Sequence, residues 1–66
     1  MRVLVNGHDE ELEPDETVTI LLERLGLSGP YALVELNGEP LERARYREVA
    51  LEEGDVIVIA GPVAGG

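Results

Sequence analysis

Short apolar runs separated by polar turns predict the elements of this chain. Residues 2–5 (RVLV) are branched and strand-like, and the Asn6-Gly7 pair that follows is a strong signal for a two-residue hairpin turn. The return strand should cover about residues 9–13, which are mostly acidic and therefore suit an exposed edge. The pattern predicts an N-terminal β-hairpin.

The clearest helical pattern lies in residues 17–27, TVTILLERLGL. Its apolar residues follow the i, i+3, i+4, i+7 spacing that gives a helix one apolar face. They are Val18, Leu21, Leu22 and Leu25. Thr17 is a good N-cap, Gly26 suits the left-handed position after the last turn, and Leu27 could then fold back on Leu22 as in a Schellman cap. We therefore predict one main helix.

The middle of the chain contains a second hairpin signal and one ambiguous segment. Residues 31–36 (YALVEL) read as a strand with alternate apolar positions, and the pair at 37–38 is again Asn-Gly. Residues 41–50 (LERARYREVA) allow two interpretations. A short helix or 3₁₀ turns would suit their charge, and a brief strand near residues 49–51 would follow.

The last apolar run, residues 56–60 (VIVIA), predicts a strand covered on both faces. Its natural place is beside the first strand, because an uncharged strand left at an edge invites aggregation. The resulting order defines an α+β domain with the layout of the ubiquitin-like β-grasp, a mixed four- to five-stranded sheet with one main helix across it. We assign residues 1–60 to this domain and residues 61–66 to a flexible C-terminal tail, since Pro62 cannot continue the sheet.

Composition narrows the possible functions. The 66 residues include no cysteine, a single histidine and no lysine, and fourteen acidic residues against five arginines give a net charge of −9. Disulfides and thiolate metal sites are therefore excluded, and a phosphate-backbone partner is disfavoured. Neither a secretory signal nor a membrane-spanning run is visible, so we expect a soluble, cytoplasmic protein that binds no nucleic acid and no membrane.

A search for catalytic chemistry finds no convincing set. The acidic clusters in residues 8–16 and 51–55 lack the ligand spacing of a hard-cation loop, and a solvated surface explains them better. His8 follows a tight turn and is best interpreted as an exposed histidine. We predict no catalytic residue, no metal site and no bound cofactor, and hence no enzyme.

The C-terminal GPVAGG stands out from this background. A frayed terminus is the usual interpretation, but this tail is small and apolar and follows directly on a rigid strand. Six extended residues reach roughly 20 Å, enough to enter a channel in a second protein. The last glycines bring no Cβ to a narrow site, and the Gly66 carboxylate is ionised at neutral pH. Attack of this carboxylate on ATP would give an acyl-adenylate, with the ATP bound by the partner enzyme.

The chain resembles the ThiS family, the sulfur carriers of thiamine biosynthesis, over essentially its full length. The matching pieces, in order, are VNG, TVTILLERLGL, VELNGE, Arg43 with Tyr46 three residues on, LEEGD and the terminal AGG. The resemblance implies that a ThiF-like enzyme adenylates Gly66 and that a cysteine desulfurase system supplies the sulfur of a thiocarboxylate. It further implies docking on the thiazole synthase ThiG. The tail residues that would enter the partner's channel are Pro62, Val63, Ala64 and Gly65.

The pathway has alternatives. Pro40 and Glu42 depart from the family pattern, and PVAGG looks more like the tail of MoaD, the molybdopterin carrier of the same fold. Carriers that thiolate tRNA and ubiquitin-like protein modifiers share the fold as well. Fold does not decide between these acceptors.

A partner surface follows from strand parity. If one alternate set of strand residues faces the helix, the other set forms a modest apolar patch beside the root of the tail. The inward set would be Val3, Val5, Val34, Leu36, Ile57 and Ile59. The outward set, our predicted docking surface, would be Leu4, Leu33, Val58 and Ala60. In the alternative interpretation the segment 41–50 covers this face, and the sequence does not fix the parity of residues 56–60.

Overall fold

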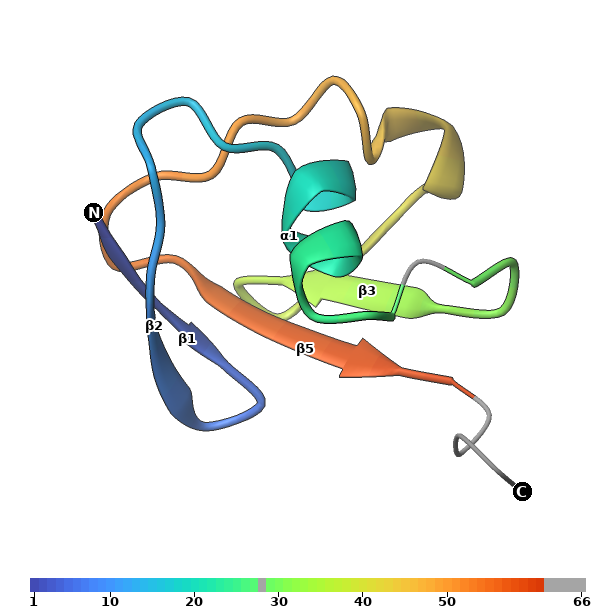
Figure 1. Cartoon of the computed structure of the whole chain (residues 1–66). Helices are drawn as coiled ribbons and strands as arrows, with labels where there is room; N and C mark the ends of the chain where they lie inside the picture. The colour runs from blue at the N-terminus through green and yellow to red at the C-terminus, as the bar shows by residue number, and fades with distance from the viewer. Residues whose placement is uncertain (28, 62–66) are drawn as a thin grey trace.

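Five strands and one α-helix make up the computed structural model, which describes residues 1–27 and 29–61 (Figure 1). In chain order the elements are β1 (Arg2–Val5), β2 (His8–Glu11), α1 (Val18–Arg24), β3 (Leu33–Leu36), β4 (Glu39–Leu41), the 3₁₀ helix η1 (Arg43–Arg45) and β5 (Val56–Ala60). The strand order is β2-β1-β5-β3-β4, with β1 and β5 parallel and the other neighbours antiparallel. This mixed sheet with one helix is the predicted ubiquitin-like β-grasp.

Both Asn-Gly pairs form hairpin turns, as predicted. Asn6 and Gly7 have φ of 50° and 84°, and Asn37 and Gly38 have φ of 51° and 86°. Two consecutive left-handed residues match the twist of the flanking strands, which is why this dipeptide favours two-residue hairpins. The first return strand covers His8–Glu11 instead of residues 9–13, because pairing starts directly after the turn with Val5 opposite His8.

The helix has both predicted caps. The Oγ1 of Thr17 accepts a hydrogen bond from the Ile20 N–H at 3.3 Å. At the other end Gly26 has φ of 73°, and the Leu27 N–H donates to the Leu22 carbonyl at 2.8 Å. These are the contacts of a Schellman motif, which satisfies carbonyls that have no partner within the helix.

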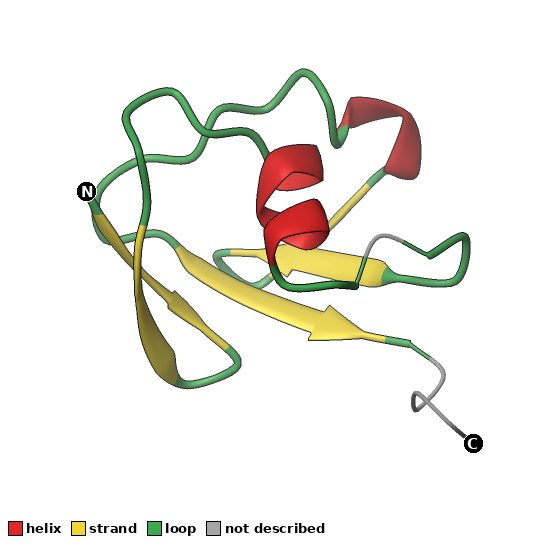
Figure 2. Cartoon of the chain, in the orientation of Figure 1, coloured by secondary structure: helices red, strands yellow, loops and turns green. Residues whose placement is uncertain are grey.

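The core lies between the sheet and α1, which crosses one face of the sheet (Figure 2). Inward-facing strand residues meet the apolar stripe of the helix, where Val18 and Leu21 have no exposed surface. Segments outside the sheet complete the cluster with Leu12, Tyr46 and Leu51. Burial of this cluster is the main favourable contribution to folding in so short a chain.

Residues 39–51 correct part of the prediction. β4 follows the second turn at once and pairs with β3, and the 3₁₀ alternative for the next residues is confirmed. The strand expected near residues 49–51 was wrong, since only an isolated bridge joins Ala50 to Thr17. The segment instead bonds to the chain before the helix, where the Leu51 N–H donates to the Glu16 carbonyl at 2.8 Å.

Tyr46 links this segment to the sheet. Its buried hydroxyl accepts from the Val34 N–H at 3.1 Å and donates to the Ala32 carbonyl at 3.2 Å. β4 ends opposite Val34, at Leu41. The tyrosine hydroxyl therefore takes over as hydrogen-bond partner where β4 no longer pairs with β3, and it satisfies a buried backbone donor and a backbone acceptor there.

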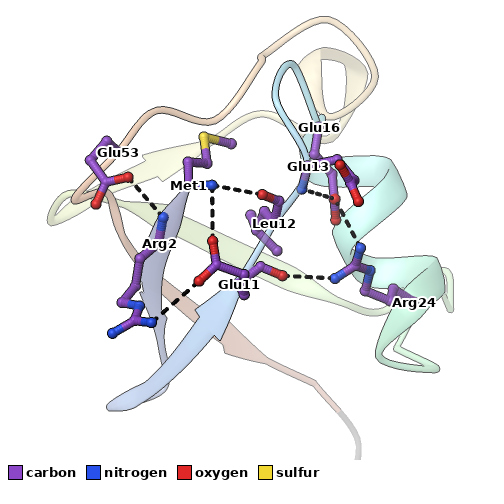
Figure 3. Close-up of polar contacts among 8 residues, drawn as sticks. All are labelled: Met1, Arg2, Glu11, Leu12, Glu13, Glu16, Arg24 and Glu53. Carbon is purple, nitrogen blue, oxygen red and sulfur yellow. Dashed lines mark hydrogen bonds and ion pairs between the residues drawn. The ribbon is translucent and has the colours of Figure 1, made fainter.

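A polar network fastens the first strand to the second (Figure 3). The Glu11 carboxylate accepts from the Met1 ammonium at 3.1 Å and from Nη2 of Arg2 at 3.3 Å. The same ammonium donates to the Leu12 carbonyl at 2.8 Å. These contacts hold the outer strand β2, whose acidic side chains contribute little to the core.

The network continues to the helix through a buried carboxylate that the sequence did not reveal. Arg24 donates through Nη1 to the Glu11 carbonyl at 3.0 Å, and its Nη2 lies 3.3 Å from Oε1 of Glu16. The Glu16 side chain is 2% exposed, and Oε1 also accepts the Glu13 N–H at 3.1 Å. Because a buried charge is costly unless it is paired, Arg24 is required by Glu16 as well as by β2.

Removing the Tyr46 hydroxyl tests whether its hydrogen bonds to the β3 segment stabilise the fold. We expect Tyr46→Phe to lower the free energy of unfolding by about 1–3 kcal/mol, since it leaves the buried Val34 N–H without a partner. Tyr31→Phe is the matched control, because Tyr31 is 68% exposed, and it should leave stability unchanged. Urea unfolding measures both. Equal effects of the two substitutions would contradict this role of Tyr46.

The Glu11 pair predicts a pH dependence. The Met1 ammonium, and then Arg2, hold the pKa of the Glu11 carboxyl below its usual value of 4.5. A carboxyl with a lower pKa in the folded state stabilises that state above the unfolded pKa, and the gain is lost as pH falls through the folded pKa. The difference in urea midpoint between the wild type and Glu11→Gln should therefore be largest near neutral pH and shrink below about pH 4.5. High salt should reduce it as well, and a difference independent of pH would contradict the prediction.

Candidate functional site: the end of β5 and the open face of the sheet

The centre of the sheet is β5, and its last residues lead into the predicted tail (Figure 1). β3 pairs with β5 along most of its length, up to Leu33 opposite Ala60. β1 pairs only with the start of β5, up to Val5 opposite Ile57. Beyond that point the β1 side of β5 has no strand beside it.

The Asn6 side chain occupies this position. Its Oδ1 accepts from the Ile59 N–H at 2.8 Å and its Nδ2 donates to the Ile59 carbonyl at 3.2 Å. The Asn6 backbone N–H also donates to the Ile57 carbonyl at 2.9 Å. A carboxamide carries one acceptor and one donor group, as a peptide unit does, so Asn6 extends the hydrogen bonding of β1 by one more residue of β5. Sequence reasoning identified this asparagine only as a turn residue.

On the β3 side, the chain after the end of β5 runs close to its neighbour at Gly61. A Cβ built on Gly61 would lie 3.2 Å from the Tyr31 carbonyl oxygen and 3.5 Å from the Ala32 Cα. Such a contact is tighter than most real Cβ contacts, so glycine permits the backbone to run this close to its neighbour. The sequence does not show this requirement, since it placed Gly61 only at the start of the predicted tail.

The remaining tail residues lie outside the described part of the chain. They are Pro62, Val63, Ala64, Gly65 and Gly66. Their predicted roles, and the predicted division into a domain of residues 1–60 and a tail of residues 61–66, stay predictions.

The parity predicted for the strands is confirmed. Val3, Val34 and Ile57 are buried against the helix, whereas Leu33 is 63% exposed and Val58 43%. Val56, at 42%, belongs to the exposed set and was not predicted. We call this exposed set the open face: Leu4, Leu33, Val56, Val58 and Ala60. The alternative in which residues 41–50 cover it is wrong, because that segment packs on the helix side.

Carboxylates border the open face. Directly paired residues point to the same face of a sheet, so the register places Asp9 beside Leu4 and Glu35 beside Val58. The result is an apolar centre bordered mainly by carboxylates, with Arg2 on the same face opposite Glu11. A partner surface with an apolar centre and basic surroundings would complement it.

The helix side carries an open groove of about 380 Å³. It is lined by Thr19, Leu22, Gly29, Pro30, Arg43, Tyr46 and Arg47. These residues include no pair of nucleophile and base. Within residues 1–27 and 29–61, no group of three or more acidic, histidine or cysteine residues could hold a metal ion, and no helix has the length and apolarity needed to cross a membrane.

Comparison with known proteins agrees with this geometry. The sequence pattern of the ThiS family matches residues 3–66. The crystal structure of the thiamine biosynthesis protein ThiS from Geobacter metallireducens superposes with a TM-score of 0.79, at 35% identity and with 100% of both chains covered. A thiazole synthase of Paramagnetospirillum magneticum is 32% identical over 66 residues, and our chain spans 20% of its length.

The sheet order and the single crossing helix define the class as a ubiquitin-like β-grasp protein. Within that class, the chain belongs to the ThiS family.

Proposed function

We propose that this chain is the sulfur carrier of thiazole formation in thiamine biosynthesis and that sulfur is carried as a thiocarboxylate on Gly66. The observation that carries the proposal is the ThiS family match, which runs through the tail to Gly66. The fold supports it, because the tail follows directly on the central strand and no catalytic set was found in the sequence. The chain acts as a co-substrate of partner enzymes and is itself no enzyme. Its expected cytoplasmic location stays a prediction.

The chemistry needs one group from this chain. The Gly66 carboxylate oxygen attacks the α-phosphorus of ATP, pyrophosphate leaves, and an acyl-adenylate forms. The terminal sulfur of a donor persulfide then attacks the acyl carbon and displaces AMP, which gives an acyl disulfide. A thiol of the donor system attacks the outer sulfur of that S–S bond, so that a disulfide forms on the donor and the thiocarboxylate is released on Gly66. We assign the ATP site to a ThiF-like enzyme and the sulfur supply to a cysteine desulfurase system.

The acceptor that we propose is the thiazole synthase ThiG. The similarity to a protein named thiazole synthase supports this partner. A thiocarboxylate suits the transfer, since its sulfur is an ionised, soft nucleophile and its acyl group can later leave as the carboxylate. The open face, with its exposed Leu33 and Val58 beside the end of β5, is the surface that we assign to partner docking.

A MoaD-like carrier is the second candidate, favoured by the tail sequence PVAGG. It would deliver the same thiocarboxylate to a molybdopterin precursor. tRNA-thiolating carriers would again use the thiocarboxylate, whereas a protein modifier would form an amide. The family match favours thiazole formation over all three.

Mass spectrometry tests the tail chemistry. With ATP, a ThiF-like enzyme, a cysteine desulfurase and cysteine, the C-terminal peptide should gain the mass difference between sulfur and oxygen. A chain without Gly65-Gly66, and a reaction without ATP, should show no gain. An unmodified wild-type chain, in the presence of an enzyme that modifies its own ThiS, would refute the proposal.

A charge on the open face tests docking. Leu33→Glu should raise the KM for the carrier in adenylation by about tenfold or more, because it buries an unpaired charge in the interface. Ile20→Glu is the matched control, since Ile20 is 47% exposed on α1, away from the open face. Its KM should remain that of the wild type. Equal effects of both substitutions, or an unchanged KM for Leu33→Glu, would exclude this face.

A further inference from the structure

We propose that the Asn6 side chain is a positioning group for the tail, holding the end of β5 so that the tail starts from a fixed point of the sheet. The inference rests on the proposed function, because it concerns how the reactive end of the chain reaches a partner's site. It assigns Asn6 a role in acyl transfer through β5, without contact to the reacting atoms.

The hydrogen bonds of Ile59 carry this inference. On the β1 side, Ile59 has no strand neighbour, and its N–H and carbonyl are both taken by the Asn6 carboxamide at 2.8 and 3.2 Å. The two residues lie 53 positions apart in sequence, so the contact joins the first hairpin to the last strand. Without it, the last residues of β5 would be held from one side only, and strand ends held in this way open readily.

These contacts are separate from the turn itself. A two-residue turn of this type needs left-handed backbone, which a Gly-Gly or Asp-Gly pair supplies equally well. The carboxamide serves a different purpose, because its oxygen accepts from the Ile59 N–H while its nitrogen donates to the Ile59 carbonyl. Aspartate would accept the Ile59 N–H but place a negative charge against the Ile59 carbonyl.

Asn37 provides an internal comparison. Its Oδ1 accepts from the Val56 N–H at 2.8 Å, and its Nδ2 donates to Oδ1 of Asp55 at 3.1 Å. Asn37 therefore holds the start of β5 from the β3 side, as Asn6 holds its end from the β1 side. The two asparagines share the turn type and the number of side-chain hydrogen bonds. They differ in that Asn6 binds the end of β5, next to the tail, and Asn37 binds its start.

The position of Asn6 couples the docking surface to the tail. Leu4 of the open face lies on β1, two residues before Asn6, and Gly61 lies two residues after Ile59. Gly61 itself runs close to the Tyr31 carbonyl, so a side chain at this position would be crowded where the chain leaves β5. When the open face is docked, a fixed strand end keeps the start of the tail at one place relative to the partner, and so favours productive encounters between the Gly66 carboxylate and the partner's ATP site.

The test compares Asn6→Gly with Asn37→Gly. Both keep the turn and both remove two side-chain hydrogen bonds. Amide hydrogen exchange should be faster by about tenfold at Ile59 in Asn6→Gly and at Val56 in Asn37→Gly. This arm needs no partner and decides whether Asn6 holds the end of β5; unchanged exchange at Ile59 would overturn the inference.

Kinetics of ATP–pyrophosphate exchange with a ThiF-like enzyme decide the positioning role. Asn6→Gly should lower kcat by about tenfold with an unchanged KM for the carrier, whereas Asn37→Gly should leave both unchanged. Asn6→Asp, which keeps the acceptor but sets a negative charge against the Ile59 carbonyl, should also lower kcat. Equal losses of kcat in both glycine variants, or a change of KM alone in Asn6→Gly, would overturn the inference.

The same assay separates the two proposals. A wild-type chain that supports no exchange refutes the proposed function, and with it the role of Asn6 in transfer. A wild-type chain that supports exchange, together with an Asn6→Gly variant of equal kcat, refutes the positioning role alone.

Discussion

The central place of β5 is the constraint on which the rest of this structure depends. This uncharged strand has backbone hydrogen-bonding groups along both of its edges, and each of them needs a partner in the sheet. β1 and β3 supply most of the partners, but each ends before it covers the whole strand. The carboxamides of Asn6 and Asn37 supply the remaining ones, at opposite ends and from opposite sides. Two hairpin turns thereby also hold the strand from which the tail starts.

The small number of segments outside the sheet also determines which face of the sheet stays open. One short helix covers only part of one face of the five-stranded sheet. Tyr46 packs on the same face, and its hydroxyl binds the backbone of the β3 segment where β4 has ended. Placing the segment that follows β4 on the helix side leaves the opposite face to exposed residues such as Leu33 and Val58. Arg24 adds a second tie, joining the helix to β2 and neutralising the buried Glu16. The apolar surface left uncovered therefore lies on the side where β5 presents its outward residues.

Local signals made much of this predictable. Asn-Gly pairs, the spacing of the helix leucines and the cap at Gly26 each act over a few residues, so the hairpins and α1 followed from sequence. β4 was not predictable in this way, because Glu39-Pro40-Leu41 has neither alternation nor β-branched residues and is placed by the turn before it. The side-chain contacts of Asn6 and Tyr46 join segments far apart in the sequence, and no pattern within one segment predicts them. The parity of Val56–Ala60 needed the register with β1, since every residue in that run is apolar.

In a protein of this class the chain cannot build an active site around its reactive group, because under the proposed function that group must enter the sites of different partners. What the chain can determine, under that function, is the surface offered for docking and the point from which the tail starts. Both are determined by the same strand: Val58 faces outward on it, and its end at Ile59 is held by Asn6. Gly61 then lies too close to the Tyr31 carbonyl for any side chain to fit without displacement. Under the proposed function, a fixed end of β5 beside the open face would let each partner place its own ATP or acceptor at one distance from a common docking surface, so that partners could differ in chemistry while the carrier stays the same.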